Sequence, residues 1–180
     1  EYYFGKYPNI IRHNRNSIAI VHGNESRTEL EYLCDDIFLH FGLGCRSVNK
    51  LYVPTGYNFQ PLIEAAQKYS HLFDHHIYHS NFDYHKALLM LNNVPFVDGG
   101  FFAIKEDKLM YSPVSIINYE HYKDINDVIE YIGNNSENIQ CVVSGKELEG
   151  INTIGLGKAQ TPQLTDYADG IDTMEWLKGL

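Results

Sequence analysis

The sequence predicts an α/β fold in which a mostly parallel sheet is covered by helices on both faces. Short apolar segments rich in β-branched residues alternate along the chain with segments of helical periodicity, as crossover connections between parallel strands require. Apolar residues make up 44% of the chain and charged residues 21%, the balance of an ordinary globular protein. A length of 180 residues fits one domain with a sizeable core.

The first predicted strand is Ser17 to Val21, which is closed by a Gly-Asn turn. Ser26 and Glu29 then stand in the S-x-x-E pattern of a capping box, which predicts a helix. Its apolar residues share one stripe, and we expect its acidic residues to face water. The stripe consists of Leu30, Leu33, Cys34, Ile37, Phe38 and Phe41, and the acidic residues are Glu29, Glu31, Asp35 and Asp36. Gly42 and Gly44 are expected to end this helix.

The same alternation continues to residue 144. Val48 to Val53 is predicted as a strand, Pro61 as a helix start and Asp124 as a helix cap. Further strands are expected at His75–Tyr78, Phe101–Ile104, Val114–Tyr119 and Ile139–Val143, and further helices at Phe82–Leu91 and Asp172–Leu177. The strands expected at Phe101–Ile104 and Val114–Tyr119 could pair as a hairpin across Lys105–Lys108.

Charge and hydropathy make two kinds of partner improbable. The net charge is −9 and the basic residues are scattered, so the chain offers no stripe for a phosphate backbone. The longest apolar runs, such as Ile18 to Val21, are far shorter than the roughly 20 residues that cross a bilayer. Cys34, Cys45 and Cys141 form neither a disulfide framework nor a CxxC metal motif. Reduced thiols and residence in the cytoplasm are therefore expected.

Two other groups of residues are expected to be structural. Cys34 lies on the apolar helix stripe and Cys141 lies within a strand, so both are predicted core residues. The five histidines between positions 71 and 85 lack a pattern of accompanying cysteines or carboxylates, so we expect a solvated cluster and no metal site. They are His71, His75, His76, His79 and His85.

The position of Cys45 suggests chemistry. It directly follows Gly42-Leu43-Gly44, between a helix end and a strand, where its thiol and peptide N–H could both be exposed at the edge of the sheet. A thiolate attacks carbonyl carbons well, and a peptide N–H can stabilise the oxyanion that forms. The alternative is a small core residue at the start of a strand, and position alone leaves both readings open.

This segment resembles the catalytic domain of the aldehyde dehydrogenase superfamily. His40-Phe41-Gly42-Leu43-Gly44-Cys45 matches the superfamily motif N-x-G-Q-x-C at its Gly and Cys positions. The long-chain acyl-CoA reductase family, which includes the reductase of bacterial bioluminescence, is more similar still. Its members carry segments like Asp36 to Arg46 and Asp166 to Met174 of this chain. Tyr111-Ser112-Pro113-Val114 resembles the F-G-P-V segment that lies near the cofactor ribose, although Leu109-Met110 replace the acidic residue before it.

The resemblance implies that Cys45 attacks an acyl-CoA and that hydride from NADPH converts the resulting acyl-thioester to an aldehyde. Gly44, Arg46 and His40 would support the thiolate or the oxyanion, and Tyr111 and Pro113 would lie near the cofactor. Relatives that oxidise aldehydes carry a glutamate that activates the water molecule which hydrolyses the acyl-enzyme. Residues 12–16 stand at its place and include no carboxylate, so the thioester is expected to survive until it is reduced.

On this reading, residues 1–16 are a boundary segment, residues 17–144 the catalytic α/β domain and residues 145–180 its C-terminal tail. NADPH would be bound mainly by an N-terminal domain outside the sequence, so the chain alone is expected to be inactive as a reductase. The resemblance also implies a homo-oligomer for the full-length protein and an acyl-protein synthetase as a partner. The alternative is a non-catalytic α/β binding or assembly domain in which Cys45 is inert. Acyl-chain length, NADPH versus NADH and the activation of the thiol stay open.

Overall fold

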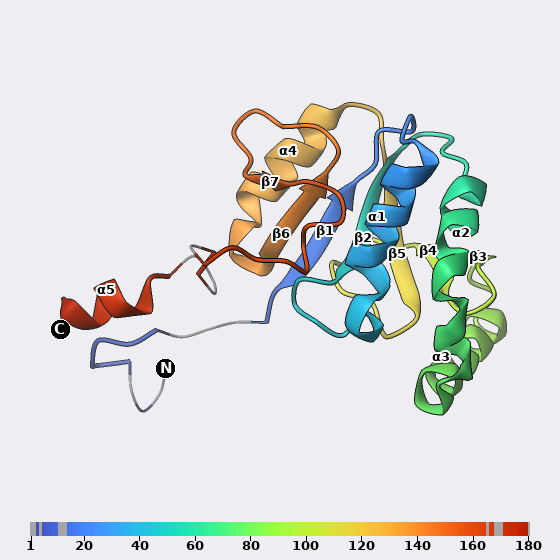
Figure 1. The fold of residues 1–180 in the computed structure, drawn as a ribbon, viewed down its shortest axis with the longest axis horizontal. Coiled ribbons are helices and arrows are strands. Elements are labelled where there is room, and N and C mark those ends of the chain that lie inside the picture. The colour runs from blue at the N-terminus through green and yellow to red at the C-terminus, as the bar shows by residue number, and fades with distance from the viewer. Residues whose placement is uncertain (1–2, 4, 11–13, 165, 168–170, 180) are drawn as a thin grey trace.

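The computed structural model describes residues 3, 5–10, 14–164, 166–167 and 171–179 (Figure 1). These residues form a seven-stranded sheet in the order β3-β4-β5-β2-β1-β6-β7. The strands are β1 (Asn16–Ile20), β2 (Val48–Pro54), β3 (Phe96–Asp98), β4 (Ala103–Glu106), β5 (Ile116–Tyr122), β6 (Ile139–Ser144) and β7 (Thr153–Ile154). The α-helices are α1 (Arg27–Phe38), α2 (Gln60–Ala66), α3 (His76–Leu91), α4 (Ile125–Asn134) and α5 (Thr173–Lys178).

The predicted fold class is confirmed. Every neighbouring pair of strands is parallel except β3 and β4. Alternate residues of β1 face opposite sides, so Ala19 packs with α1 and α2 while Ile18 and Ile20 pack with α4. Helices therefore cover both faces of the sheet (Figure 1). No helix among the described residues is both long enough and apolar enough to span a membrane.

Helix α1 begins as its sequence predicts. The Ser26 hydroxyl accepts the Glu29 peptide N–H, and the Glu29 carboxylate accepts the Ser26 peptide N–H, which completes the capping box. The apolar stripe is buried up to Phe38, and Phe41 falls in the short 3-10 turn Leu39–Gly42 that follows. One expectation is wrong: Asp36 is fully buried instead of facing water, and its role is described below.

Two predicted strand arrangements are also wrong. His75–Tyr78 is not a strand, because His75 precedes α3 and Tyr78 belongs to it. Tyr78, Phe82 and Leu89 are the buried residues of α3, and a segment as short as His75–Tyr78 does not reveal that longer helical period.

The predicted hairpin around Lys105–Lys108 is a parallel pair instead. β4 and β5 pair in parallel, with Ala103 opposite Ile116, and residues 107–115 return the chain along the strands. The antiparallel partner of β4 is β3, which the sequence analysis missed, as it missed the two-residue strand β7. The hairpin was inferred from the short connection, but nine or so extended residues can span roughly 30 Å, enough to reverse along a four-residue strand.

Candidate active site

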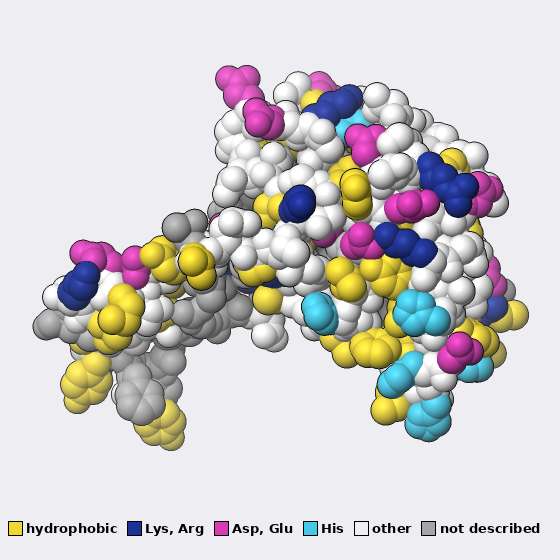
Figure 2. All heavy atoms as spheres, in the orientation of Figure 1, with side chains coloured by type: hydrophobic (Ala, Val, Ile, Leu, Met, Phe, Trp, Pro, Cys, Tyr) yellow, Lys and Arg dark blue, Asp and Glu magenta, His cyan; other side chains and the backbone are white. Residues whose placement is uncertain are grey.

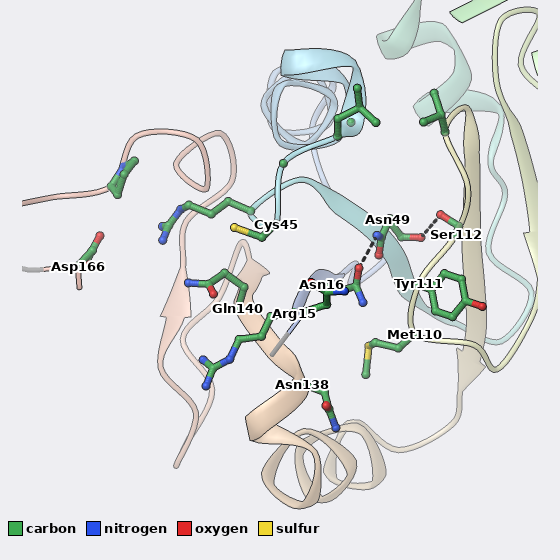
Figure 3. Close-up of a pocket in the computed structure, with 17 residues that line it drawn as sticks. Arg15, Asn16, Cys45, Asn49, Met110, Tyr111, Ser112, Asn138, Gln140 and Asp166 are labelled. Carbon is green, nitrogen blue, oxygen red and sulfur yellow. Dashed lines mark hydrogen bonds between the residues drawn. The ribbon is translucent and has the colours of Figure 1, made fainter. Parts of the chain in front are cut away.

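A cavity opens where the amino ends of β1, β2 and β6 meet (Figure 3). It has a volume of about 1060 Å³. The lining residues come from five segments: the start of β1, the turn before β2, β2 itself, the loop before β5 and the start of β6, with the C-terminal tail closing one side. They are Asn14, Arg15, Asn16, Gly42, Leu43, Gly44, Cys45, Arg46, Asn49, Met110, Tyr111, Ser112, Val114, Asn138, Gln140, Pro162 and Asp166.

Cys45 lies in the turn between α1 and β2, is exposed, and lines this cavity (Figure 3). Two hydrogen bonds close the turn around it: the Ser47 peptide N–H donates to the Gly44 carbonyl at 2.9 Å, and the Gly44 peptide N–H donates to the Ser47 hydroxyl at 3.2 Å. The Ser17 hydroxyl donates to the Cys45 carbonyl at 2.9 Å, which ties the turn to β1. The structure thus confirms the predicted position of Cys45 in a loop facing a cleft.

The other two cysteines are buried, as predicted. Burial raises the pKa of the Cys34 thiol to about 12 and also raises the pKa of the Cys141 thiol. Because the thiolate is the reactive form, both thiols are poor nucleophiles at neutral pH. Cys45 is therefore the cysteine that can meet a substrate.

A left-handed backbone delivers Cys45 to the cavity. His40, Phe41 and Gly42 have φ values of 56°, 61° and 69°. This conformation reverses the chain after α1, and it is costly for residues that carry a Cβ. A Cβ at Gly42 would also lie 3.1 Å from the Ile37 carbonyl oxygen. The turn that presents the thiol thus needs glycine at this position.

We predict that Gly42→Ala lowers the free energy of unfolding by about 1–2 kcal/mol, because alanine is strained at positive φ. Urea denaturation measures this change. Gly133→Ala is the matched control, since Gly133 lies in α4 with ordinary backbone geometry and nothing within 4 Å of an added Cβ. That control should gain roughly 0.5–1 kcal/mol. An equal response of both variants would show that the Gly42 turn is not strained.

The structure brings some of the predicted supporting residues to Cys45 and separates others from it. Gly44 and Arg46 line the cavity, and the Arg46 Nε donates to the Ala159 carbonyl. His40 is exposed in the 3-10 turn and does not line the cavity, because the left-handed turn separates it from the thiol. Tyr111 lines the cavity, whereas Pro113 borders a separate small cleft near the end of α1.

Asp36 joins the C-terminal tail to the turn that carries Cys45. Its carboxylate accepts the peptide N–H of Gly157 at 2.6 Å and that of Ala159 at 2.9 Å. The next residue, Gln160, donates through Nε2 to the Ser47 hydroxyl at 3.0 Å. Since that same hydroxyl accepts the Gly44 peptide N–H, one chain of contacts leads from Asp36 to the thiol turn.

Burial raises the pKa of the Asp36 carboxyl to about 6. The two peptide N–H groups oppose this rise, and the neighbouring Asp35 charge adds to it, while Arg46 counteracts it. Sequence reasoning missed Asp36 because its partners lie more than a hundred residues away along the chain.

A group of amide side chains lines the cavity at the amino ends of three adjacent strands. Asn49 Nδ2 donates to Asn16 Oδ1 at 3.1 Å, and Asn138 and Gln140 approach from the start of β6. In Figure 3 Gln140 and Arg15 lie on the Cys45 side, with Met110 and Tyr111 across the cavity. These amides were not predicted as site residues from the sequence. A signal was present, because a polar residue stands at the start of each buried strand and parallel strands bring these starts to one edge.

One carboxylate also lines the cavity. Asp166 reaches it from the tail, where its Oδ2 accepts the Gln163 peptide N–H at 2.9 Å. The sequence led us to expect no hydrolytic carboxylate within residues 12–16. Residues 12 and 13 lie outside the described residues, and Asn14, Arg15 and Asn16 line the cavity. The resembling segment Asp166–Met174 is partly described, since residues 168–170 lie outside it.

Two features of the described part of the chain bear on a cofactor: whether it holds a metal site, and whether its β1–α1 turn fits a dinucleotide phosphate. Groups of three or more histidine, cysteine or acidic side chains that could hold a metal ion are absent from it, and the histidines gather at the α2–α3 end (Figure 2). At the β1–α1 turn, the Glu25 carboxylate accepts the peptide N–H groups of His22 and Gly23, at 2.5 and 2.9 Å. Because a carboxylate already occupies these donors, this turn does not fit a dinucleotide phosphate.

Comparison with known proteins gives a distant likeness to solved structures. No protein-family model matches the sequence, and no curated protein matches it. A crystal structure of a protein from Burkholderia cenocepacia, assigned provisionally as an aldehyde dehydrogenase, is similar with a TM-score of 0.43 and 11% sequence identity. The match covers 74% of this chain and 35% of that protein. At this TM-score the likeness carries no argument about function.

Proposed function

We propose that the protein takes an acyl group from an acyl-CoA onto Cys45 and that this acyl-thioester is reduced to an aldehyde. The observation that supports the proposal is the placement of Cys45: an exposed thiol in a rigid glycine turn on a cavity of about 1060 Å³. The resemblance of the segment Asp36–Arg46 to long-chain acyl-CoA reductases supplies the substrate class.

The transfer is a displacement at the thioester carbon. The Cys45 thiolate forms a new S–C bond, and the carbonyl oxygen carries the negative charge of the tetrahedral intermediate. Among the described residues, the Cys45 peptide N–H has no hydrogen-bond acceptor, so it is available to this oxyanion. The intermediate collapses when the bond to coenzyme A breaks, and the departing thiolate takes up the proton that Cys45 released.

Reduction needs a hydride donor, which we propose to be NADPH bound outside the described residues. When bound, NADPH would supply hydride to the acyl carbon. The described residues do not fit the cofactor at the β1–α1 turn, where Glu25 holds the peptide N–H groups. We therefore expect the chain alone to form the acyl-thioester and to show no NADPH-dependent turnover.

The supporting roles divide by position. Gly44 and Arg46 line the cavity beside Cys45, so we keep them as residues that support the thiolate or the oxyanion. Tyr111 also lines the cavity, and we keep it as a residue near the cofactor. His40 and Pro113 lie outside the cavity lining, so we assign them no contact with the acyl group.

Asp166 favours a second candidate function, the hydrolysis of an acyl-thioester. A carboxylate on the cavity can accept a proton from water that attacks the acyl-enzyme. In that case the acyl group would leave as a carboxylic acid with no reductant.

The fate of the acyl group distinguishes the two functions. We expect mass spectrometry after incubation with an acyl-CoA to show one acyl adduct on Cys45, matched by one released coenzyme A. For a reductase, the adduct should persist in buffer, and its half-life should differ by at most twofold between the wild type and Asp166→Asn. A wild-type adduct that is lost quickly, and that Asp166→Asn preserves by about a hundredfold or more, would establish the hydrolase instead.

A further inference from the structure

We infer that Met110 limits the size of the group that can bind opposite Cys45, and that Asn118 is the positioning residue that holds Met110 there. That the bound group is an acyl chain rests on the proposed function. The size limit itself depends only on the shape of the cavity.

Met110 forms an apolar wall across the cavity from Cys45 (Figure 3). It is half-buried, and its side chain also packs against the core cluster beneath α4 that includes Ile18, Ile139 and Val142. Its neighbours Leu109 and Tyr111 are instead exposed. Of these three residues, Met110 is therefore the one whose side chain has firm support behind it.

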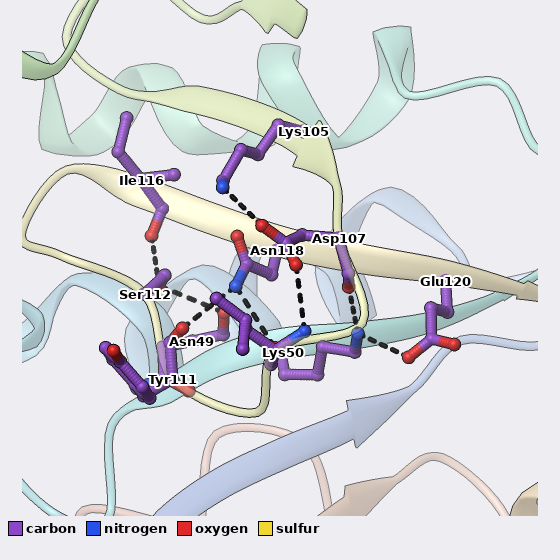
Figure 4. A network of polar contacts seen from close by, with 10 residues as sticks. Asn49, Lys50, Lys105, Asp107, Tyr111, Ser112, Ile116, Asn118 and Glu120 are labelled. Carbon is purple, nitrogen blue, oxygen red and sulfur yellow. Dashed lines mark hydrogen bonds and ion pairs between the residues drawn. The ribbon is translucent and has the colours of Figure 1, made fainter. Parts of the chain in front are cut away.

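Asn118 grips the backbone on both sides of Met110 (Figure 4). Its Nδ2 donates to the Leu109 carbonyl at 3.1 Å and to the Tyr111 carbonyl at 2.9 Å. Asn118 is 1% exposed on β5, and its Oδ1 is buried without a partner among the described residues. The unpaired Oδ1 costs free energy, so the stabilising contribution of the Asn118 side chain comes from the two hydrogen bonds that its Nδ2 donates.

Contacts of Lys50 and Ser112 hold the two ends of the same segment (Figure 4). The fully buried Lys50 donates through Nζ to the Asp107 carbonyl and pairs with Glu120 at 2.6 Å. At the other end, the Ser112 hydroxyl lies 3.2 Å from the Asn49 carbonyl and 2.5 Å from the Ile116 carbonyl.

Residues 107–112 are thus anchored by buried side chains of β2 and β5 and not by a helix or strand of their own. A loop held in this way keeps Met110 in one position on the wall opposite the thiol. A group that extends from Cys45 toward this wall must push Met110 into a closely packed core, which is costly.

The size limit is tested with maleimides that share one reactive ring. The second-order rate constants for alkylation of Cys45 are measured with N-methylmaleimide and N-cyclohexylmaleimide, and their ratio is the readout. We expect Met110→Ala to raise the ratio of the rate constant for N-cyclohexylmaleimide to that for N-methylmaleimide by about tenfold. Leu109→Ala is the matched control and should leave the ratio within about twofold, because Leu109 is exposed and does not line the cavity. A Met110→Ala ratio equal to that of the wild type would overturn the inference.

The role of Asn118 is tested with the same ratio. Asn118→Leu removes both donors, so the loop should yield and the ratio should rise several-fold while the rate with N-methylmaleimide stays unchanged. A general loss of structure would instead raise both rates together. If Asn118→Leu does not fold, Ser112→Ala, which removes one anchor, decides the question in the same way. A folded variant with the wild-type ratio would refute the positioning role.

Acyl-CoA chains of different length then separate this inference from the proposed function. If the maleimide pattern is as expected but no acyl-CoA labels Cys45, the wall stands and the thioester function fails. If acyl-CoA labels Cys45 and Met110→Ala does not extend the range of accepted acyl groups, the function stands and the inference fails.

Discussion

Replacement of Cys45 by serine or alanine is expected to abolish acyl-enzyme formation, with a loss of at least about a thousandfold. Alanine has no nucleophile, and an alcohol is a far poorer one than a thiolate at neutral pH. The left-handed turn and the two hydrogen bonds around Gly44 do not involve the Cys45 side chain, so both variants should fold. Mass spectrometry after incubation with an acyl-CoA measures the adduct.

The other two cysteines provide matched controls. Cys34→Ala and Cys141→Ala should keep acyl labelling of Cys45 and lose about 1 kcal/mol of unfolding free energy, since each removes a small buried group. In the unmodified protein, iodoacetamide should label Cys45 well before the other two. Slow labelling of Cys45 by iodoacetamide, together with no acyl adduct on the wild type, would favour the alternative of a binding or assembly domain with an inert cysteine.

The second large effect is expected on stability. Asp36→Ala should lower the free energy of unfolding by about 2–4 kcal/mol, because it leaves the buried peptide N–H groups of Gly157 and Ala159 without acceptors. The tail would lose its attachment to α1, and the Gln160 contact with Ser47 should weaken with it. Urea denaturation measures the stability, and hydrogen exchange at Gly157 and Ala159 measures the release of the tail.

Asp36 also predicts a pH dependence whose sign is unusual for a carboxyl group. Burial raises its pKa in the folded protein to about 6, above the value of about 3.9 for an unfolded aspartate. Its contribution to stability is therefore complete below about pH 4 and is lost as the pH rises through about 6. Relative to Asp36→Asn, which does not titrate, the wild type should lose about 2–3 kcal/mol of unfolding free energy between pH 4 and pH 7.5.

Glu31→Ala is the control for both measurements on Asp36. Glu31 lies on the same helix but forms an exposed pair with Arg27, so its loss should cost less than about 1 kcal/mol. If the difference in unfolding free energy between the wild type and Asp36→Asn does not change with pH, the buried carboxyl keeps an ordinary pKa. An Asp36→Ala variant as stable as Glu31→Ala would show that the tail is not held by this carboxylate.

The fold class could be predicted because local patterns decide it. The capping box at Ser26, the apolar stripe of α1 and the buried strands β1, β2 and β6 are each encoded within a few neighbouring residues. The errors fell where local patterns are ambiguous. His75–Tyr78 is too short to separate a strand from a helix, and the direction of β5 beside β4 depends on the path of residues 107–115.

The position of Cys45 in a loop after α1 was likewise readable from the sequence, since two glycines so close together, at 42 and 44, favour a turn over a helix, although α1 itself already ends at Phe38. The cavity around it was not, because its walls come from segments as far apart in sequence as Asn14 and Asp166. The parallel order β5-β2-β1-β6 and the packing of the tail bring these segments together. The same holds for Asp36 and Asn118: helical and strand periods assign each a face, but what that face meets depends on the packing of a distant segment. By itself the sequence determined most of the helices and strands and the candidate nucleophile. Tertiary structure decided which polar residues became buried partners, because a buried hydrogen bond forms between groups that are close in space and can be far apart in sequence.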